Sequence, residues 1–580
     1  MKKFGLLITI LVLFFSFSSC EDLLDKKPLD KISSADLWNS EGLIDGYMVD
    51  LYARVTPMYS WVQFTEDDWS DDIHSDNNNA VAQEAITNSY DAGWNKYDII
   101  RLCNQAIEQV AVSEVLSDEM IVQYTAEART LRAMVYFWMV RYFGGVMLVD
   151  KVLDPTSDMK LPRASESDMY DFIVEDLKYG KDNLPETTYL GRLNRASAHA
   201  FLIRVLLQAH RYEDAVIEGK SFIVDHANYG YIIDTNFHGI FNDFETGQES
   251  TETIFLRYGT SDGMNMQWTP MQFRLPLSTG EGDKLGVIND YDRNLYGWAM
   301  CYPTQELIDD FLMIDEDGVA KKWSDTKIWK DSYASGEKLC TQVMYKNRDK
   351  RFYSSIIYDG CIYLNDTINI RPPYWNHRTS MDRNLHRGMT GYNIRKGMYD
   401  DVCDWAWPPP EQDYHWPLLR LSEVYLNYAE ALIRTNKADL ALPYINETRT
   451  IHGGLPKITS TDDIWEDYKR ERRCELAFEN LRYWDLIRWA EYDKKETVDE
   501  LNHDPSYIDF NSEGTKYVIM TVNGKYVSGD KAMYDALPNK VYNNGNTFPE
   551  RIFTKKRFRF PVPKSEILEN ENLKQNPGWE

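Results

Sequence analysis

The chain has 580 residues, 43% of them apolar, so it is long enough to bury a large core. Its formal net charge of −27 disfavours binding to nucleic acid and to anionic lipid surfaces. The sequence contains no HExxH motif and no CxxC pair, so we expect neither a metal-centred enzyme nor a cofactor.

The N-terminus predicts export and lipidation. Two lysines precede an apolar run over residues 4–15, which is shorter than the roughly 20 residues that a membrane-spanning helix needs. Two small serines then lead to Cys20, the layout of a signal peptide that ends at a lipid-acceptor cysteine. We expect residues 1–19 to be removed and Cys20 to carry the lipid, with residues 20–34 as a tether. The alternative is a secretory signal followed by an ordinary cysteine.

Helical periodicity covers the first large part of the chain, residues 35–225. Amphipathic patterns predict helices over residues 35–57, 94–112, 120–143 and 168–184, and two more between 195 and 225. Gly144-Gly145 is a typical helix stop after the longest of these. Paired helices with small residues at their crossing points predict tetratricopeptide-like hairpins, although no 34-residue repeat is exact.

Regular periodicity stops between residues 226 and 415, where Gly, Pro, Asp and aromatic residues are frequent and residues 253–258 form a strand-like run. A stretch of this length without a pattern is typical of functional surface. Further patterns predict helices over residues 416–435, 438–450 and 461–492, and a hairpin over 517–527 that turns at Asn523-Gly524. We predict one mainly α domain over residues 35–580. Its helical repeats are 35–225 and 416–492, its ligand-binding loops 226–415, and its C-terminal loops and hairpin 493–580.

Cysteine pairing stays open at this point. Six cysteines remain when Cys20 is set aside, and six cysteines allow 15 pairings. The alternative is that several of them are free and buried.

Several sequence blocks, in order over nearly the whole chain, resemble the SusD/RagB family of surface glycan-binding lipoproteins. The blocks are EARTLRA at 127–133, YFGGV at 142–146, PTQEL at 303–307, NRD at 347–349 with RF at 351–352, PLLRLSE at 417–423 with YAEA at 428–431, RRCELAFENLRYWDL at 472–486, PVPKSEI at 561–567 and QNPGW at 575–579. Their charged residues also have helical spacing, so we expect them to form ion pairs between packed helices. Asn480 stands where the family commonly has Gly, and Asn tolerates a left-handed backbone.

The resemblance implies a lipoprotein of the outer membrane that faces the cell exterior. It implies binding of oligosaccharides or polysaccharide and their delivery to a SusC-like TonB-dependent transporter. Glu21-Asp22, directly after Cys20, resembles the export signal of such lipoproteins. Two alternatives remain open: a peptide-binding surface lipoprotein, and a structural lid of the transporter that binds no ligand.

Aromatic residues are the candidates for sugar contact, because a sugar ring stacks on flat apolar surfaces while polar groups meet its hydroxyls. The chain has 17 Trp and 38 Tyr, residues that suit a surface with one apolar and one wet side. The resemblance places the ligand surface on loops outside the helical repeats. The predicted ligand-binding residues are Trp61, Trp69, Asp72, Trp268, Arg274, Tyr291, Tyr296 and Trp298. The alternative for each aromatic residue is packing inside its own loop.

An acidic loop offers the alternative of catalysis. Asp67, Asp68, Asp71 and Asp72 contain enough carboxyls for the pair that glycoside hydrolysis needs. In a chain with 91 acidic residues such a cluster is expected by chance, and we expect no enzyme. Calcium binding by the same loop is a further alternative, although the loop lacks the ligand spacing and central Gly of an EF-hand.

Overall fold

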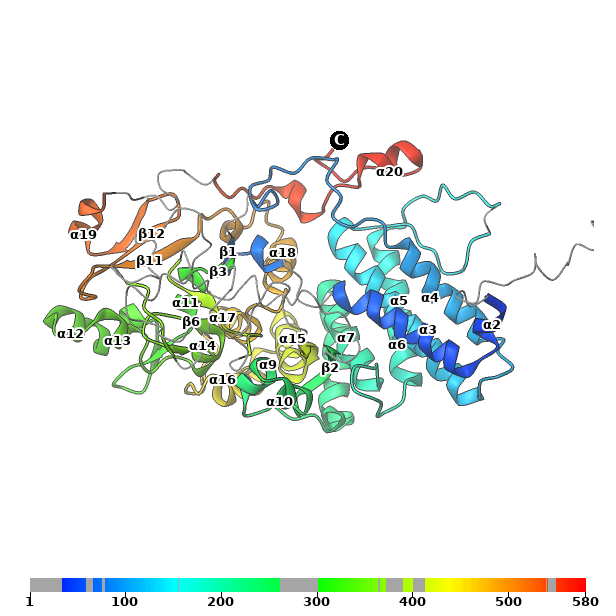
Figure 1. Ribbon diagram of the computed structural model, residues 1–580, viewed down its shortest axis with the longest axis horizontal. Helices are drawn as coiled ribbons and strands as arrows, with labels where there is room; N and C mark the ends of the chain where they lie inside the picture. The colour runs from blue at the N-terminus through cyan, green and yellow to red at the C-terminus, as the bar shows by residue number, and fades with distance from the viewer. Residues whose placement is uncertain are drawn as a thin grey trace, which may run out of the picture.

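The computed structural model describes residues 34–58, 66–75, 79–154, 156–260, 301–363, 366–371, 390–399, 413–538, 540 and 549–580. Over these residues the protein is mainly α-helical with a few short strands, which confirms the predicted fold class (Figure 1). No described helix has both the length and the hydropathy that crossing a bilayer demands.

Seven helices that precede residue 221 form what we call the helical half, most of which lies at the right of Figure 1. They are α2 (Ser34–Trp38), α3 (Glu41–Val55), α4 (Tyr97–Val110), α5 (Asp118–Phe143), α6 (Glu166–Asn183), α7 (Arg195–Gln208) and α8 (Tyr212–Lys220). The helices predicted in this region are therefore confirmed. Gly144 follows α5 with a φ of 71°, which a residue with a side chain rarely adopts, so it ends the helix where the sequence indicated.

Small residues let these helices pack closely in antiparallel succession, with α5 against α6, α6 against α7, and α7 against α8. Gly180 of α6 shows why. A Cβ atom on it would lie 2.2 Å from Thr130 Oγ1 of α5 and 3.2 Å from the Cβ of Ala198 on α7. The stack continues through α15 (Leu421–Arg434), which packs beside α8. The next helix, α16 (Ala438–Ile451), packs on α15. This arrangement is the predicted tetratricopeptide-like scaffold.

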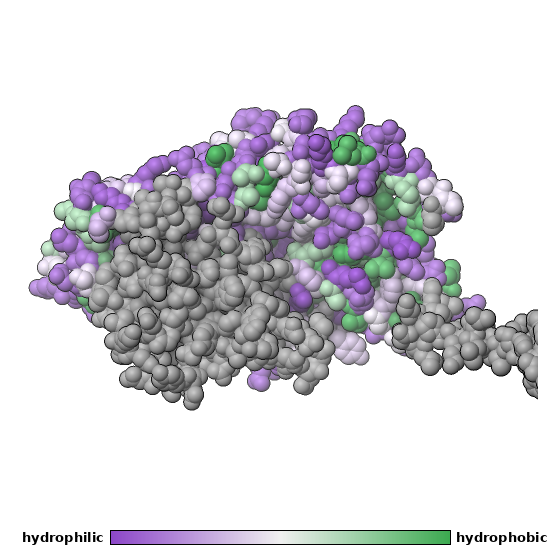
Figure 2. Space-filling model, turned by 45° about the horizontal axis from the view of Figure 1, so that its top comes forward, coloured by the Kyte–Doolittle hydropathy of each residue, from purple (hydrophilic) through white to green (hydrophobic). Residues whose placement is uncertain are grey.

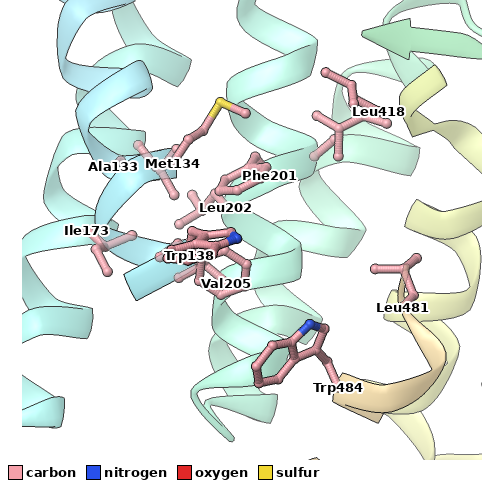
Figure 3. Close-up of a cluster of buried hydrophobic side chains, with 14 of the residues drawn as sticks. Ala133, Met134, Trp138, Ile173, Phe201, Leu202, Val205, Leu418, Leu481 and Trp484 are labelled. Carbon is pink, nitrogen blue, oxygen red and sulfur yellow. The ribbon is translucent and has the colours of Figure 1, made fainter. Parts of the chain in front are cut away.

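A continuous apolar core lies between these helices. Figure 3 shows side chains of α5, α6 and α7 gathered in the core, with others facing them from later segments of the chain. Phe137 and Phe201 meet edge to face with their ring centroids 5.3 Å apart. Burial of this apolar surface, at about 25 cal/mol per Å², is the main force that holds the helices together.

Strand β10 corrects one boundary of the sequence prediction. The predicted helix over residues 416–435 begins only at Leu421, because Tyr414–Arg420 forms β10. This strand pairs antiparallel with β2 (Thr253–Gly259), with Tyr414 opposite Gly259 and Arg420 opposite Thr253. The partner strand lies about 160 positions earlier, so the local pattern did not indicate the pairing. The strand predicted over residues 253–258 is confirmed as β2.

The helix predicted over residues 461–492 is two helices, α17 (Ile464–Leu476) and α18 (Arg482–Tyr492). Between them the backbone of Phe478 and Asn480 takes φ values of 65° and 60°. The left-handed conformation breaks the helical hydrogen-bond ladder. Asn480 therefore adopts the left-handed backbone conformation that asparagine tolerates.

The mixed half comprises α17 and the short elements around it, and much of it lies at the left of Figure 1. Its elements before residue 400 are α9 (Phe237–Asn242), α10 (Phe244–Gln248), β3 (Cys301–Pro303), α11 (Gln305–Asp310), β4 (Met313–Ile314), β5 (Ala320–Lys321), α12 (Lys327–Ser335), α13 (Cys340–Met344), α14 (Lys350–Ser355), β6 (Ile356–Ile357), β7 (Ile362–Tyr363), β8 (Asp366–Thr367) and β9 (Asn393–Ile394). A second, smaller apolar core holds this half together.

Strands β11 (Ser506–Phe510), β12 (Tyr517–Thr521) and β13 (Tyr526–Gly529) form one antiparallel sheet. Gly524, with a φ of 83°, lies in the turn between β12 and β13, so the predicted hairpin is confirmed. The chain continues through α19 (Lys531–Ala536) and ends after α20 (Lys564–Glu569).

The described cysteines are free and buried, namely Cys103, Cys301, Cys340, Cys361 and Cys474. The open question of pairing is thus answered for these five, whereas Cys403 lies outside the described residues. On the face that Figure 2 shows, the described residues are mostly hydrophilic with hydrophobic ones scattered among them, as the acidic composition leads one to expect.

Candidate functional site

Most of the predicted ligand-binding residues lie outside the described residues. These are Trp61, Trp268, Arg274, Tyr291, Tyr296 and Trp298. The predicted lipid acceptor Cys20 also lies outside the described residues. Two members of the predicted set, Trp69 and Asp72, are described, and the two residues belong to the acidic segment that precedes β1 (Ile73–Ser75).

Trp69 packs into an aromatic cluster in the core. It closes the short helix η3 (Glu66–Trp69), and its ring meets Tyr142 and Tyr483 edge to face at centroid distances of 5.9 and 5.4 Å. Phe560 lies 5.3 Å away on another side. The structure thus gives Trp69 the packing role that was the alternative for each aromatic candidate.

Asp72 is completely buried and joins two distant parts of the chain. Arg473 on α17 donates from Nε to its carboxylate at 2.7 Å, and Arg482 donates to the adjacent Asp71 at 2.8 and 2.9 Å. Burial raises the pKa of Asp72, and Arg473 offsets only part of that effect. At Asp71 burial acts in the same direction, but the two guanidiniums prevail and hold its pKa well below the usual range.

These contacts make the acidic loop a structural joint. Its paired carboxylates hold the start of β1 against α17 and α18, with both oxygens of Asp71 and one oxygen of Asp72 bound by guanidinium groups. Asp71 is a poor general base because its pKa is lowered, and the guanidinium partners commit both carboxylates to one position. The geometry of Asp71 and Asp72 therefore favours architecture over acid–base chemistry.

Two short strand pairs fix the places where the predicted ligand loops leave the body. Ser75 of β1 is paired with Cys301 of β3, so residues 76–78 and the end of residues 261–300 adjoin one ladder. Gly259 of β2 is paired with Tyr414 of β10, so the start of residues 261–300 adjoins the end of residues 400–412. Segments far apart in sequence are therefore attached to the scaffold at shared positions.

Exposed aromatic and apolar side chains lie beside the second of these positions. We call Tyr189, Leu190 and Tyr258 the aromatic shelf; they are 83%, 42% and 40% exposed. The backbone N–H of Arg192 donates to the carbonyl of Tyr189 at 3.1 Å and closes a tight turn. The Tyr258 ring covers Gly191 in that turn so closely that a Cβ there would lie 2.8 Å from Tyr258 Cε1.

The aromatic shelf is the described surface best suited to stacking on a sugar ring. It lies two residues before residues 261–300 and is built on β2 and on the turn between α6 and α7. Flat rings held by a rigid turn give an apolar platform at little cost in side-chain entropy. Sequence analysis missed these residues. The sequence does contain a signal for them: Tyr189 and Leu190 lie after Pro185, outside any helical pattern that would bury an apolar side chain.

A buried cluster in the mixed half has the geometry of a metal site but the chemistry of an ion-pair network. We call Glu252, Arg351, Arg420, His452 and Glu475 the ionic centre; all of them are almost fully buried. One ligand atom from each of Glu252, His452 and Glu475 lies within 4.8 Å of the others. However, Arg420 donates to Glu252 at 2.9 Å and Arg351 donates to Glu475 at 2.9 Å, so two guanidiniums already supply the positive charge.

The histidine of the ionic centre is itself cationic. Its Nδ1 lies 2.9 Å from Glu475 Oε1, and its Nε2 lies 3.1 Å from Glu252 Oε2. Burial works against the charged ring, but the two carboxylates prevail and raise the pKa of His452 to about 10. The ring thus completes an ion-pair network that joins α14, α16 and α17 to the start of β2 and the end of β10.

Comparisons with known proteins agree with this architecture. A family model described as the SusD family matches residues 251–579, which is more than half of the chain. A second model, described as "Starch-binding associating with outer membrane", matches residues 22–207. A SusD-like protein of Bacteroides ovatus is 24% identical over 612 residues, and the alignment covers 98% of this chain and 97% of that protein.

Solved structures give the same result for the fold. A SusD-like protein from Bacteroides fragilis superimposes with a TM-score of 0.73 at 26% identity, covering 95% of this chain and 100% of the other. A SusD-like carbohydrate binding protein from the same species has a TM-score of 0.71 at 21% identity, covering 93% and 100%. The helical scaffold and the mixed half are therefore both shared with these structures.

Proposed function

The chain belongs to the SusD family, and we propose that it is a lipid-anchored protein of the outer membrane that binds oligosaccharides or polysaccharide at the cell exterior. We further propose that it delivers them to a SusC-like TonB-dependent transporter. The description of the model that matches residues 22–207, which names starch binding and the outer membrane, supports the location and the ligand class. A solved relative that is a carbohydrate binding protein supports the same ligand class.

The N-terminal sequence supports the anchor. Cys20 follows an apolar run that is too short to span a bilayer, and the family match begins two residues after it. Acyl chains on this cysteine would bury methylenes at about 0.8 kcal/mol each, and more than one chain gives stable anchoring.

The observation that carries the proposal is the aromatic shelf beside the paired ends of β2 and β10. It offers exposed rings at the base of residues 261–300, which contain the proposed contacts Trp268, Tyr291, Tyr296 and Trp298. Arg274 in the same segment, and Trp61 in the early loop, are proposed as further contacts. We propose that the shelf and these residues together stack on successive sugar rings.

A binding assay with matched variants tests the proposal. The chain from residue 21 onward is run through affinity gels that contain starch, β-glucan, xylan or mannan, and any hit is quantified by calorimetry. We expect Tyr189→Ala combined with Tyr258→Ala to weaken binding at least tenfold, or about 1.4 kcal/mol. Tyr526→Ala is the control, because Tyr526 is 37% exposed on β13, a different element.

Two results would contradict the proposal. If the double variant binds as the wild type does, the shelf is not part of the ligand site. If no polysaccharide retards the protein, peptide binding or a structural lid becomes the better explanation. Unchanged thermal unfolding of the double variant would show that weakened binding does not come from a damaged fold.

A further inference from the structure

A surface groove in the mixed half shares no residue with the aromatic shelf. Its volume is about 670 Å³, and it lies between the β4–β5 hairpin on one side and the α16–α17 connection and the start of α17 on the other. All of its lining residues belong to the described part of the chain. A groove of this size matches the volume range of small-molecule sites.

Hydrogen bonds make the α16–α17 wall of the groove rigid. The side chain of Asn446 accepts from the N–H of Ile458 at 2.8 Å and donates to the carbonyl of the same residue at 2.9 Å. Arg449 Nε donates to the carbonyl of Pro456 at 2.7 Å. Three bonds from α16 thus hold residues 456–458 in one conformation, which lowers the entropy cost of binding a ligand there.

Arg449 presents an unused guanidinium edge in this groove. The residue is only 6% exposed, and it lines the groove. Beyond the bond from Nε, its two terminal nitrogens have no hydrogen bond or ion pair to any described residue. Terminal nitrogens without a protein acceptor are available to a ligand, and two parallel N–H groups fit an oxyanion in a bidentate manner.

Two of the neighbouring cations of the groove, Lys321 and Arg470, are paired, and the other two, Lys322 and Lys457, are exposed, whereas Arg449 is buried. Lys321 donates to Asp315 and Asp317 at 2.7 Å each, in the β4–β5 hairpin. Arg470 donates to Asp467 at 3.1 Å on α17. These partners neutralise Lys321 and Arg470, so an anion entering the groove meets the donor edge of buried Arg449 together with the exposed charges of Lys322 and Lys457.

The rim of the groove carries carboxylates that suit hydroxyl groups. Asp325, Asp462 and Asp463 line the groove, and all three are exposed. Carboxylate oxygens are strong acceptors for O–H donors. The same charges repel a ligand with many anionic groups. The groove therefore fits a hydroxylated molecule with one anionic group.

We propose that this groove is a second ligand site that binds an acidic sugar residue. A uronate carboxylate or a sulfate ester pairs with Arg449, and the sugar hydroxyls donate to the rim carboxylates. The saccharide nature of the ligand rests on the proposed function, whereas the anionic group rests on Arg449. The net charge of −27 alone favours neutral or cationic ligands, so a preference for an acidic sugar is a specific prediction.

Calorimetry with three trisaccharides tests this site. The probes are galactotriose, the same trisaccharide with galacturonate as its non-reducing residue, and galactotriose with a single sulfate at O6, and the second and third distinguish a carboxylate from a sulfate ester. We expect at least one anionic probe to bind tenfold or more tightly than the neutral one. Arg449→Gln is expected to abolish this preference, and Lys220→Gln, an exposed cation at the end of α8, is expected to leave it unchanged within twofold.

A second variant keeps the test decisive if Arg449→Gln does not fold. Val319, at the tip of the β4–β5 hairpin, is 50% exposed and lines the groove. Val319→Glu adds a negative charge there without removing a buried contact, so we expect it to weaken binding of the anionic probe at least fivefold.

Outcomes for the two sites are distinguishable. Equal affinity for the neutral and both anionic probes, or a preference that survives in both variants, would overturn the second site. Neutral polysaccharide binding that depends on Tyr189 and Tyr258 would at the same time uphold the proposed function. Failure of every neutral and acidic saccharide to bind would overturn both.

Discussion

In the helical half, α5, α6 and α7 meet through apolar side chains such as Phe201 and Leu202. In the ionic centre, by contrast, α14, α16 and α17 meet around the charged side chains of Arg351, Arg420 and Glu475. The helical half also has a buried ion pair, Arg132–Asp176, but that pair joins two helices that already share an apolar interface. The ionic centre instead joins segments that are scattered over more than 200 positions of the chain.

This difference separates two tasks. Apolar contacts are not directional, so they hold a stack of helices and tolerate exchanges that keep the volume. Directional ion pairs fix short segments that bury little surface of their own, at the cost of an exact set of partners. The predicted ligand loops depart from β2 and β10, and Glu252 precedes β2 while Arg420 ends β10. The ionic centre thus holds the end of the β2–β10 ladder where Thr253 pairs with Arg420, which is the end opposite to the one beside the aromatic shelf.

The largest expected effect is that of replacing Arg420 in the ionic centre by methionine, compared with a methionine substitution in the apolar core of the helical half. Arg420→Met leaves Glu252 and Glu475 short of a partner in a buried site, and we expect it to lower the free energy of unfolding by about 3–5 kcal/mol. Leu202→Met keeps the volume in the apolar core and is expected to cost less than about 1.5 kcal/mol. Urea unfolding of both variants measures the contrast.

Equal losses in the two methionine variants would contradict the division of labour between the halves. Lys327→Met is the control for charge removal alone. Lys327 is 62% exposed and pairs with exposed Glu316 and Asp331, so its loss is expected to leave the free energy of unfolding nearly unchanged.

The ionic centre also predicts a dependence on pH that the apolar core lacks. The pKa of His452 is raised from 6.5 to about 10, so folding takes up a proton between these pH values. The stabilisation by the charged ring is therefore complete below pH 6.5 and is lost as the pH rises through 10. We expect His452→Gln to cost about 3 kcal/mol at pH 7. The difference in the free energy of unfolding between wild type and variant should shrink toward pH 10, by at most about 1.4 kcal/mol per pH unit.

Urea unfolding at pH 7, 8, 9 and 10 provides the measurement for this variant. His226→Gln, at an exposed histidine a few residues after α8, serves as the control for replacing a histidine. A constant difference between wild type and His452→Gln over this range would mean that the ring is not charged in the folded protein.

Two glycines test how closely the helical half is packed. A Cβ on Gly180 would lie 2.2 Å from Thr130 Oγ1, so Gly180→Ala is expected to cost about 1–3 kcal/mol. A Cβ on Gly46 of α3 would have no atom within 4 Å, so Gly46→Ala is expected to stabilise by up to about 1 kcal/mol through helix propensity. Shifts of the same sign in thermal unfolding would refute the packing argument.

The scaffold was predictable from sequence because each long helix carries its own evidence. The pattern of buried positions Ile44, Met48, Leu51 and Val55 repeats every three or four residues, and Gly144 marks the end of α5. The ion pairs of the family blocks were predictable for the same reason, since Arg473 and Glu475 occupy positions on a helix that must be buried. Local chemistry was sufficient in these cases.

The candidate site was less predictable because its contacts are distant in sequence. Asp72 is bound by Arg473, 401 positions away, and no local pattern distinguishes a buried, paired aspartate from an exposed one. The free guanidinium edge of Arg449 and the exposure of Tyr189 likewise depend on which segments fold around them. The break between α17 and α18 was missed because its residues keep helical spacing and only their backbone angles differ.

That break provides the smallest expected effect. Asn480 has a φ of 60°, its N–H donates to Asp67 at 2.9 Å, and its side-chain Oδ1 is buried with no hydrogen-bond partner. Asn480→Gly removes the backbone strain and the unpaired oxygen and keeps the N–H, so we expect a gain of about 0.5 kcal/mol. Asn480→Ala keeps a Cβ in the left-handed region and loses about 1 kcal/mol.

The sign of the difference between the two Asn480 variants, measured by urea unfolding, decides what the residue contributes. If alanine is as stable as glycine, backbone strain is not stored at this position. If both variants are less stable than the wild type, the asparagine side chain itself stabilises the joint. In the expected case, the bond from the Asn480 N–H to Asp67 is enough to hold η3 against the α17–α18 break. The position of this short helix then depends on backbone conformation between α17 and α18.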